Sequence, residues 1–288
     1  MVMKAEELSL KHKSLLNKKL QILGNGLSEY CFSNLYLFRK VHEYQVIKGE
    51  KTFISGHTYD GASFLMPVFD TTTVDSHFML DSLAGFDFFF PIDENQLASF
   101  DPDIFSATYN VDDSDYIFSS EKLRSYNSRK LRKKRNLMNQ FQRKYTVEFH
   151  TIESMIRKDA EEILKQWQVA TGKTINETDF IPCWEALSLM DHLDLFGYIC
   201  YADGKPVGFI LAKIILPGIC VFHFAKGNRA FKGVFQYMFN QFANLHAVDF
   251  EYYNFEQDMG KLNFRKTKES YSPDKLLHKY RVSLREKG

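Results

Sequence analysis

Two stretches of the chain repeat one pattern, in which three short apolar runs are separated by turn residues. The first is HEYQVIKGEKTFISGHTYDGASFLMPVFD, residues 42–70, and the second is GYICYADGKPVGFILAKIILPGICVFHFAKG, residues 197–227. Their turn residues are Lys48-Gly49-Glu50, Asp60-Gly61, Asp203-Gly204 and Pro217-Gly218. Apolar runs joined by short glycine-containing turns are typical of antiparallel hairpins. Each stretch therefore predicts a three-stranded antiparallel meander.

Helical patterns surround the second meander. Residues 154–171 carry one apolar stripe, and residues 231–245 repeat apolar side chains at the i, i+3, i+4, i+7 spacing of an amphipathic helix. The aromatic-rich segment VDFEYYNF that follows alternates as a strand does. From about Tyr145 the predicted order is strand, helix, helix, three strands, helix, strand, helix, strand. This order predicts an α+β fold with helices on both faces of a mixed sheet.

A similar but less legible order fills the first half of the chain. The length of 288 residues is sufficient for two domains of ordinary size. The pattern therefore predicts a structural duplication, with two domains of one architecture. The expected boundaries are an N-terminal domain over residues 1–121, a basic linking helix over 122–145, and a C-terminal domain over 146–288 that carries the candidate site.

Composition excludes several classes of protein. The net charge of +1 argues against a molecule that binds polyanions over its whole surface. The four cysteines form no CxxC pair and the nine histidines form no HExxH motif, so neither a metal site nor a disulfide framework is expected. The polar N-terminus is unlike a signal peptide, and no apolar stretch reaches the roughly 18 residues of a membrane-spanning helix. We therefore expect a soluble, cytoplasmic protein with no tightly bound cofactor.

One stretch, KLRSYNSRKLRKKRNLMNQFQRK at residues 122–144, has ten basic residues and no acidic one. If it is a single helix, its apolar residues share one face, and Lys134 lies near that face rather than with the other cations. The amine of Lys134 then either reaches the edge of the helix or points into a cleft. The stretch as a whole is either a solvated basic face or a surface for the phosphates of a nucleic acid or a lipid headgroup.

The segment HFAKGNRAFKGVF, residues 223–235, leads from a predicted strand into a predicted helix. Helix N-termini present free N–H groups that bind phosphate. Gly227 and Gly233 give this segment flexibility, and Lys226 adds a positive charge. The alternative is an ordinary strand-to-helix turn.

The segment YYNFEQDMGKLNFRKTKESYSPDKLLHKY, residues 252–280, interleaves aromatic, cationic and acidic side chains. A plain surface helix or a plain core strand does not need this mixture. The segment is either a ligand-binding cluster or an ion-pair network that ties the last helix to the sheet.

Four motifs occur in a fixed order: FSNLYLFR at residues 32–39, KKRNLMNQF at 133–141, the HFAKGNRAFKGVF segment, and NFEQDMGKLNFRKTKESYSP at 254–273. Together they resemble the soluble domain of phosphatidylglycerol lysyltransferases and, more closely, related stand-alone bacterial proteins of unassigned function. The resemblance extends from about residue 32 to residue 280, and the last motif is its specific part.

The resemblance implies two GNAT-type acyltransferase domains in tandem. In the lysyltransferases, the aminoacyl group of a charged tRNA passes to a hydroxyl of a lipid headgroup. We therefore expect an enzyme that transfers an aminoacyl group from aminoacyl-tRNA to an amine or hydroxyl of a small molecule, lipid headgroup or peptide. The alternative is a non-catalytic GNAT-fold module that binds RNA or a charged small molecule. An acyl-CoA donor is less favoured, because Arg229 to Val234 keeps only part of the R/Q-x-x-G-x-G/A loop usual in acetyl-CoA-using GNAT domains.

The chemistry of aminoacyl transfer suggests roles for residues in these motifs. Glu256 and Asp258, two apart on an extended segment, would face one side and hold the ammonium group of the donor. Arg265 and Lys268, three apart on a helix, would bind a phosphate or the acyl oxygen. Tyr271 would donate a hydrogen bond or stack on a base, and with the two carboxylates it forms the predicted catalytic set. The predicted substrate- and anion-binding residues are Arg265, Lys268, Lys134, Arg135, Lys226 and Asn254.

Overall fold

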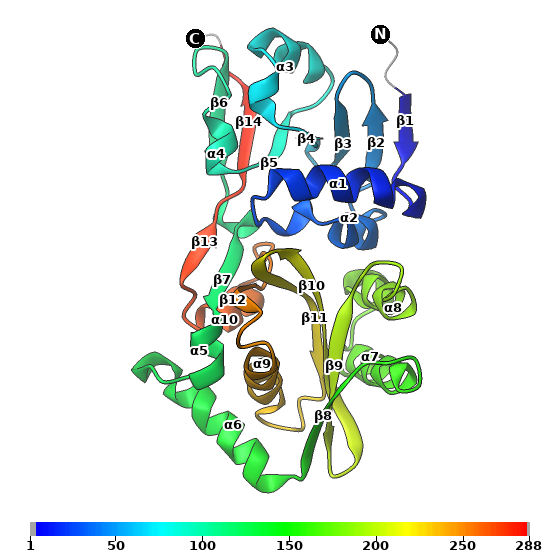
Figure 1. Ribbon diagram of the computed structural model, residues 1–288, viewed down its shortest axis with the longest axis vertical. Helices are drawn as coiled ribbons and strands as arrows, with labels where there is room; N and C mark the ends of the chain where they lie inside the picture. The colour runs from blue at the N-terminus through cyan, green and yellow to red at the C-terminus, as the bar shows by residue number, and fades with distance from the viewer. Residues whose placement is uncertain (1–3, 287–288) are drawn as a thin grey trace. The chain divides into compact units, whose positions relative to one another are not determined.

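The computed structural model describes residues 4–286, which form two compact units. The first unit contains the described residues up to Asp115, Gln257–Leu262 and the described residues from Leu276 onward. The second unit contains Tyr116–Glu256 and Asn263–Lys275. The chain therefore passes repeatedly between the units, as the colours of Figure 1 show.

The first unit is built on a seven-stranded sheet with the order β1-β2-β3-β4-β5-β14-β6. Its strands are β1 (Lys4–Glu7), β2 (Gln45–Lys48), β3 (Thr52–His57), β4 (Ser63–Pro67), β5 (Phe88–Ile92), β6 (Phe105–Tyr109) and β14 (Tyr280–Leu284). Its helices are η1 (Leu10–His12), α1 (Lys13–Leu23), η2 (Ser28–Tyr30), α2 (Phe32–Phe38), η3 (Thr71–Thr73), α3 (Ser76–Ser82), α4 (Glu94–Leu97) and η4 (Val111–Asp113). Strands β2, β3 and β4 pair antiparallel and confirm the first predicted meander.

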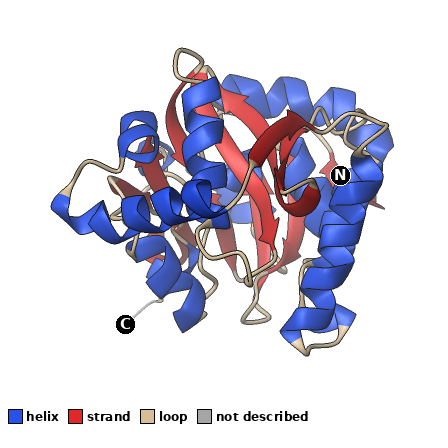
Figure 2. Cartoon of the chain, turned by 90° about the horizontal axis from the view of Figure 1, so that it is seen from below, coloured by secondary structure: helices blue, strands red, loops and turns tan. Residues whose placement is uncertain are grey.

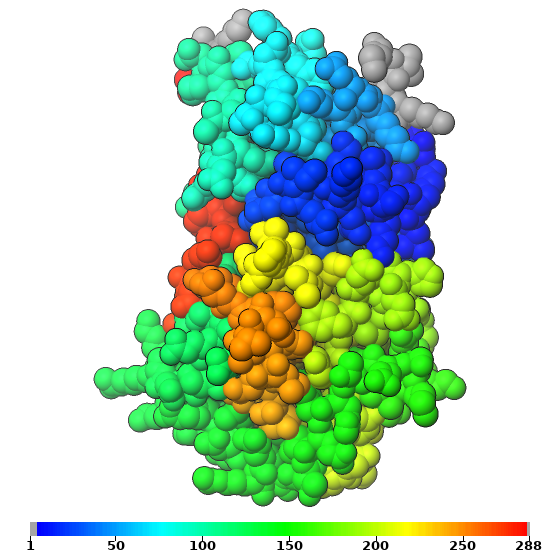
Figure 3. Space-filling model, viewed as in Figure 1, coloured from blue at the N-terminus to red at the C-terminus, as the bar shows by residue number. Residues whose placement is uncertain are grey.

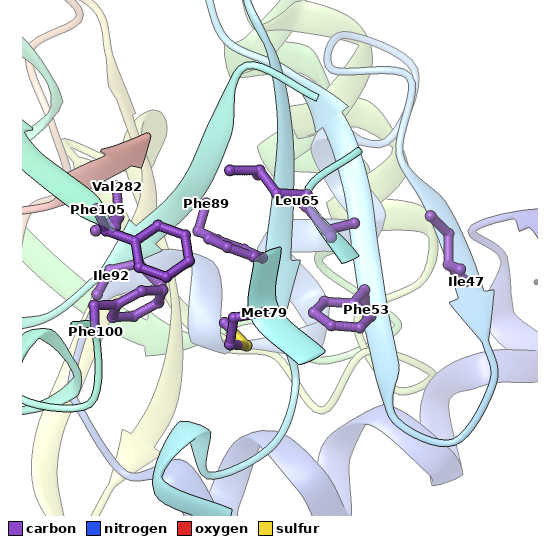
Figure 4. Close-up of a cluster of buried hydrophobic side chains, with 10 residues drawn as sticks. Ile47, Phe53, Leu65, Met79, Phe89, Ile92, Phe100, Phe105 and Val282 are labelled. Atoms are coloured by element: carbon purple, nitrogen blue, oxygen red, sulfur yellow. The ribbon is translucent and has the colours of Figure 1, made fainter. Parts of the chain in front are cut away.

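Aromatic side chains fill the core of the first unit. Phe53 on β3 and Phe89 on β5 are buried, and their ring centroids lie 6.5 Å apart. Phe89 also contacts the rings of Phe100 and Phe105, and Val282 from β14 belongs to the same cluster (Figure 4). Rings bury large apolar areas, so these side chains contribute strongly to the core of the first unit.

The second unit is built on another seven-stranded sheet, with the order β13-β7-β12-β11-β10-β9-β8. Its strands are β7 (Asp115–Ser119), β8 (Val147–Thr151), β9 (Phe196–Ala202), β10 (Lys205–Leu216), β11 (Gly218–Gly227), β12 (Phe250–Asn254) and β13 (Lys275–Leu277). Its helices are α5 (Ser120–Ser125), η5 (Arg129–Leu131), α6 (Arg132–Lys144), α7 (Arg157–Thr171), η6 (Ile175–Glu177), α8 (Phe180–Ser188), α9 (Val234–Leu245) and α10 (Leu262–Glu269). Helices α7 and α8 lie on one face of the sheet and α9 on the other, and Figure 2 shows helices on both sides of the strands.

The two sheets share one topology, which confirms the predicted duplication and the α+β class. In each sheet, four antiparallel strands lead to a parallel pair, which is β4 with β5 in the first unit and β11 with β12 in the second. The second predicted meander is β9, β10 and β11, and the predicted helices over 154–171 and 231–245 are α7 and α9.

Each sheet also contains a strand from the other half of the sequence. Strand β14, near the C-terminus, lies between β5 and β6, while β7 lies between β12 and β13. The observed division therefore differs from the predicted one, which placed all of 146–288 in the C-terminal domain and set the first boundary at residue 121. Local hydrophobic alternation identifies β14 as a strand, but it does not tell which sheet supplies its partners.

The basic stretch is not the single helix predicted over residues 122–144. Helix α5 ends at Ser125, and Tyr126 adopts a left-handed backbone conformation with φ of 48°. The chain then enters η5 and α6, and the whole stretch belongs to the second unit. The buried Tyr126 side chain explains the break, since its hydroxyl donates to the backbone oxygen of Gln236 on α9 at 3.0 Å.

None of the helices between residues 4 and 286 has both the length and the apolar character that spanning a bilayer requires.

Candidate active site

The parallel strands β11 and β12 part within the second unit. They pair from Gly218 and Phe250 as far as Val221 and Asn254, where β12 ends and β11 continues to Gly227. Beyond this point a side-chain contact joins the two segments. The Nδ1 atom of His223, on β11, lies 2.8 Å from Oε1 of Glu256, two residues after β12.

The histidine of this pair is enclosed, whereas the carboxylate reaches the surface. The side chain of His223 is 0% exposed and that of Glu256 is 17% exposed. The pair therefore places a carboxylate at the edge of the protein with an imidazole behind it. Such a carboxylate can bind a cationic group or accept a proton.

The sequence prediction included Glu256 but missed His223. One signal was present: His223 is the one polar residue in the apolar run ICVFHFA of residues 219–225. A polar side chain buried in a strand needs a partner, because an unsatisfied buried group costs roughly 1–3 kcal/mol. The run itself does not identify that partner, which lies 33 residues further along the chain.

Several hydrogen bonds hold the backbone at Glu256. Its N–H donates to Oδ1 of the fully buried Asn254 at 2.7 Å. The N–H of Phe255 donates to the backbone oxygen of Tyr116 at 2.9 Å, and the N–H of Tyr116 donates to the backbone oxygen of Glu256 at 3.3 Å. Lys268 donates to the carbonyl oxygens of Phe255 and Glu256 at 2.6 and 2.9 Å. Glu256 has a φ of 58°, a left-handed conformation that costs a non-glycine residue roughly 1–2 kcal/mol. The surrounding bonds stabilise this conformation.

The prediction that Glu256 to Asp258 form an extended segment is wrong. The backbone of Glu256 is in the left-handed conformation, and a turn follows it. Asp258 is fully buried and accepts the N–H of Gly260 through Oδ1 at 2.8 Å, and its carbonyl oxygen accepts the N–H of Lys261 at 3.0 Å. Asp258 also belongs to the first unit and Glu256 to the second. Alternation along a strand therefore does not bring the two carboxylates to one side, and Asp258 stabilises the turn.

Helix α10 carries Arg265 and Lys268, so the helical spacing predicted for them is confirmed. Lys268 is half-buried, and its bonds to the two carbonyl oxygens orient the backbone of Glu256. Arg265 is also half-buried, one helical turn before Lys268.

Tyr271 lies in an aromatic cluster. It is buried, and its hydroxyl accepts a hydrogen bond from Nε2 of Gln236 at 2.8 Å. The centroid of its ring lies 5.6 Å from that of Phe239 and 6.4 Å from that of Phe255. Burial raises the pKa of Tyr271 well above its ordinary value, so the phenol stays protonated at neutral pH. These contacts make Tyr271 a supporting residue behind the segment that holds Glu256.

Two other predicted residues lie near this cluster. The amine of Lys134 is 3.9 Å from the ring centroid of Tyr271, and it donates to Oγ of Ser270 at 2.6 Å. Arg135 donates through Nη1 to the backbone oxygen of Tyr126 at 3.2 Å, where it satisfies the carbonyl at the break between α5 and η5. In the space-filling view, side chains fill the space between the ribbons of α6 and α9 (Figure 3).

Lys226 has a different environment from the one predicted for it. Its amine contacts both carboxylate oxygens of Asp179, at 2.6 and 2.7 Å, and lies 3.7 Å from the ring centroid of Trp167. Because it is 5% exposed and already paired, it has little charge to offer to a phosphate. The adjacent hollow, lined by Trp167, Gly227, Asn228, Arg229 and neighbours on α7, has a volume of about 70 Å³. Binding pockets for small molecules are usually about 300–1,000 Å³.

Gly233 serves packing rather than flexibility. It has a φ of 97°, and a Cβ atom added there would lie 2.2 Å from the backbone oxygen of Leu137 on α6. Only glycine lets α9 begin this close to α6.

Within the described residues there is no cluster of His, Cys, Asp and Glu side chains that could hold a metal ion.

The two sheets and their parallel pairs define a tandem GNAT-like architecture. The chain belongs to the family described as phosphatidylglycerol lysyltransferase, C-terminal, whose model matches residues 20–283. The resemblance indicated by the four motifs is thereby confirmed. No curated protein sequence matches the chain.

Solved structures share the fold. A conserved protein of unknown function from Bacteroides thetaiotaomicron VPI-5482 is 21% identical, with a TM-score of 0.85 over 99% of this chain and 100% of that chain. L-PGS from Bacillus licheniformis is 12% identical, with a TM-score of 0.63 over 96% and 92%. FemX is 10% identical, with a TM-score of 0.58 over 98% of both chains. At these identities the likeness concerns the fold.

Proposed function

We propose that the protein is an aminoacyltransferase that passes an aminoacyl group from aminoacyl-tRNA to an amine or hydroxyl acceptor. Its family and fold support acyl transfer. Aminoacyl-tRNA as the donor, and a lipid headgroup, peptide or small molecule as the acceptor, are the specific parts of this proposal.

The choice of aminoacyl-tRNA as the donor rests on the positive charge of η5 and α6, which has no neighbouring negative charge. Arg129, Lys130, Arg132, Lys133, Arg143 and Lys144 are all exposed. Within the described chain, none of them has a carboxylate oxygen within the 4.0 Å of an ion pair. Clustered cations without counter-ions repel one another and attract a polyanion. The phosphate backbone of tRNA has the complementary charge.

The Glu256 carboxylate suits the other charged part of an aminoacyl-tRNA, the ammonium group of the amino acid. Its side chain is partly exposed and contacts His223, while Lys268 holds the backbone of Glu256 through its carbonyl oxygen. In the reaction, the acceptor nitrogen or oxygen attacks the ester carbon, the bond to the ribose oxygen breaks, and the ribose hydroxyl leaves with the proton that the acceptor loses. The ester is already activated, so positioning and fixed charges can supply most of the catalysis.

The test is to incubate the protein with aminoacyl-tRNAs that carry radiolabelled amino acids and with separate acceptors. The acceptors are phosphatidylglycerol vesicles and short peptides with a free N-terminus. We expect label in one acceptor, and we expect Glu256→Gln to reduce the transfer. Deacylated tRNA binding, measured in parallel, distinguishes the alternative: an RNA-binding module binds tRNA but transfers no label to any acceptor.

A further inference from the structure

Strand β8 forms one edge of the sheet in the second unit. It pairs with β9 on one side, and no described strand pairs with its other side. Two backbone hydrogen bonds fix the pattern of this pairing: the N–H of Ile152 donates to the oxygen of Gly197 at 2.9 Å, and the N–H of Asp203 donates to the oxygen of Thr146 at 2.8 Å. Bonded residues alternate along an antiparallel pair, so the even-numbered residues from 146 to 152 bond toward β9.

The odd-numbered residues of β8 therefore turn their N–H and C=O groups away from the sheet. These residues are Val147, Phe149 and Thr151; Thr151 is exposed, and the other two are half-buried. A row of such groups can accept a further strand, as in complexes where an extended peptide adds to the edge of a sheet.

A groove of about 590 Å³ lies beside this strand. Its volume is within the roughly 300–1,000 Å³ of ordinary ligand pockets. Side chains from β8, from β9 and from the connection to α7 line it, among them Glu148, His150, Thr151, Glu153, Ile156 and Tyr201. The open edge of the sheet and the groove therefore share residues of one strand.

The groove is acidic and aromatic. Glu148 and Glu153 are both exposed, and none of the residues that line the groove is Lys or Arg. The hydroxyl of Tyr201 donates to Oδ2 of Asp159 at 2.5 Å, which adds a third carboxylate behind the ring. Nε2 of His150 lies 2.9 Å from Oε2 of Glu148, and the centroids of the His150 and Tyr201 rings lie 5.7 Å apart. Carboxylates beside aromatic rings suit the long, cationic side chains of lysine and arginine.

We propose that β8 is the docking site of a basic peptide segment, which adds to the sheet as an antiparallel strand. The residues opposite Glu148 and His150 then place their side chains on the side of the groove, and the residue between them exchanges both backbone hydrogen bonds with Phe149. The matching segment therefore has lysine or arginine at alternate positions. A second copy of this edge fits less well, because it would bring further carboxylates to an acidic groove.

This docking site is separate from the candidate active site. In the sheet, β9, β10 and β11 lie between β8 and β12, the strand that leads to Glu256. Peptide binding at β8 involves neither tRNA nor transfer of an aminoacyl group, so its test stands apart from the test of the proposed function.

The experiment titrates the full chain into a fluorescent peptide that alternates lysine and threonine and has both ends capped, and fluorescence anisotropy gives the affinity. The matched control peptide alternates glutamate and threonine, and we expect it not to bind. Two further peptides test the strand pairing. In the proposed register, the threonine N–H groups donate to β8 and the lysine N–H groups point away from it. Methylation of the threonine nitrogens should therefore abolish binding, whereas methylation of the lysine nitrogens should leave it nearly unchanged.

Variants of the chain test the same site from the other side. Thr151→Pro removes one outward N–H at a position where an edge strand tolerates proline, and it should weaken binding about tenfold. Thr151→Ala keeps the N–H and should bind as the wild type does. Glu148→Gln and Glu153→Gln should each weaken binding about two- to fivefold, since each removes an opposite charge near the added strand. Glu50→Gln is the control for charge, because Glu50 is exposed between β2 and β3 in the first unit.

Thermal unfolding of the two Thr151 variants shows whether both are folded, and the methylated peptides test the pairing without any change to the chain. Equal affinities of the two methylated peptides, or the opposite order, would overturn the proposal. Equal binding of the lysine and glutamate peptides would also overturn it. Sedimentation provides the last check: a dimer that Thr151→Pro converts to a monomer would show that a second copy, rather than a basic peptide, occupies the edge.

Discussion

The amine of Lys279 lies 2.7 Å from Oδ1 of Asp115, and both side chains are fully buried within the first unit. The same amine contacts Oε1 of Glu29 at 2.8 Å and Oγ of Ser28 at 3.2 Å. Asp115 ends the N-terminal segment of this unit, and Lys279 precedes β14 in its C-terminal segment. The cluster therefore fixes the last strand of the chain to the unit formed by the first part of the sequence.

Replacing Lys279 by methionine should destabilise the first unit strongly. The variant leaves two buried carboxylates without their cation, and breaking a buried ion pair costs about 3–5 kcal/mol. Chemical denaturation followed by fluorescence measures the change. Lys275→Met is the matched control because Lys275 is exposed, and its replacement should change the unfolding free energy by roughly 0–1 kcal/mol. Equal effects of the two substitutions would contradict this account.

Glu29 gives the cluster a predictable pH dependence. Burial raises the pKa of Glu29 from 4.5 to about 7, since one lysine faces two carboxylates. The folded protein therefore binds a proton that the unfolded chain has lost, and the stability due to this group falls as pH rises from about 4.5 toward 7.

The Glu29→Gln variant cannot lose this proton, so its stability should fall less over the same range. The unfolding free energies of wild type and Glu29→Gln, measured at several pH values between 5 and 8, give the difference due to this group. Subtracting the two curves removes the opposite contributions of His12 and His42, whose pKa values burial lowers. Parallel curves would show that Glu29 stays ionised in the folded protein.

Local patterns in the sequence predicted the elements built from local contacts. Both meanders, α7, α9 and the helical spacing of Arg265 and Lys268 could be predicted because each depends on periodicity or on turn residues within a short segment. The break at Tyr126 could not, because it depends on the contact with Gln236 on α9, 110 residues away.

The candidate site shows the same limit. Glu256 could be predicted from its motif, but its left-handed backbone, its contact with His223 and its support by Lys268 depend on three separate segments of the chain. Lys226 was predicted as an anion-binding residue from its local segment. In the structure its amine pairs with Asp179, which lies 47 residues earlier and is not part of that segment. Charge in a sequence does not reveal which cations already have partners.

Gly233 should be far more sensitive to alanine than another glycine with positive φ. Gly233→Ala places a Cβ atom 2.2 Å from the Leu137 backbone oxygen, so α6 or α9 has to move. Gly172 has a φ of 66°, but no atom lies within 4 Å of its added Cβ. Gly172→Ala should cost about 1–2 kcal/mol, the conformational cost alone. Gly233→Ala should cost about 1–3 kcal/mol more, because overpacking is added. Thermal unfolding of both variants tests the difference, and equal losses would show that the two helices are not tightly packed.

Arg265 and Lys268 should respond differently to substitution, although they share one helix. Lys268→Met removes the charged donor to the carbonyl oxygens of Phe255 and Glu256. Losing such a bond typically costs about 1.5–3 kcal/mol, so this variant should be less stable as well as less active in the transfer assay.

Arg265→Ala should leave the stability largely unchanged and lower ligand affinity or turnover by roughly ten- to a hundredfold. This is the predicted effect of a cation that binds the donor or acceptor. Arg265→Lys should restore only part of the loss, since the planar guanidinium is absent. Denaturation and transfer assays on the three variants separate these roles: an unstable Arg265→Ala protein would assign Arg265 to a structural network, and a stable, fully active one would leave it no role in the site.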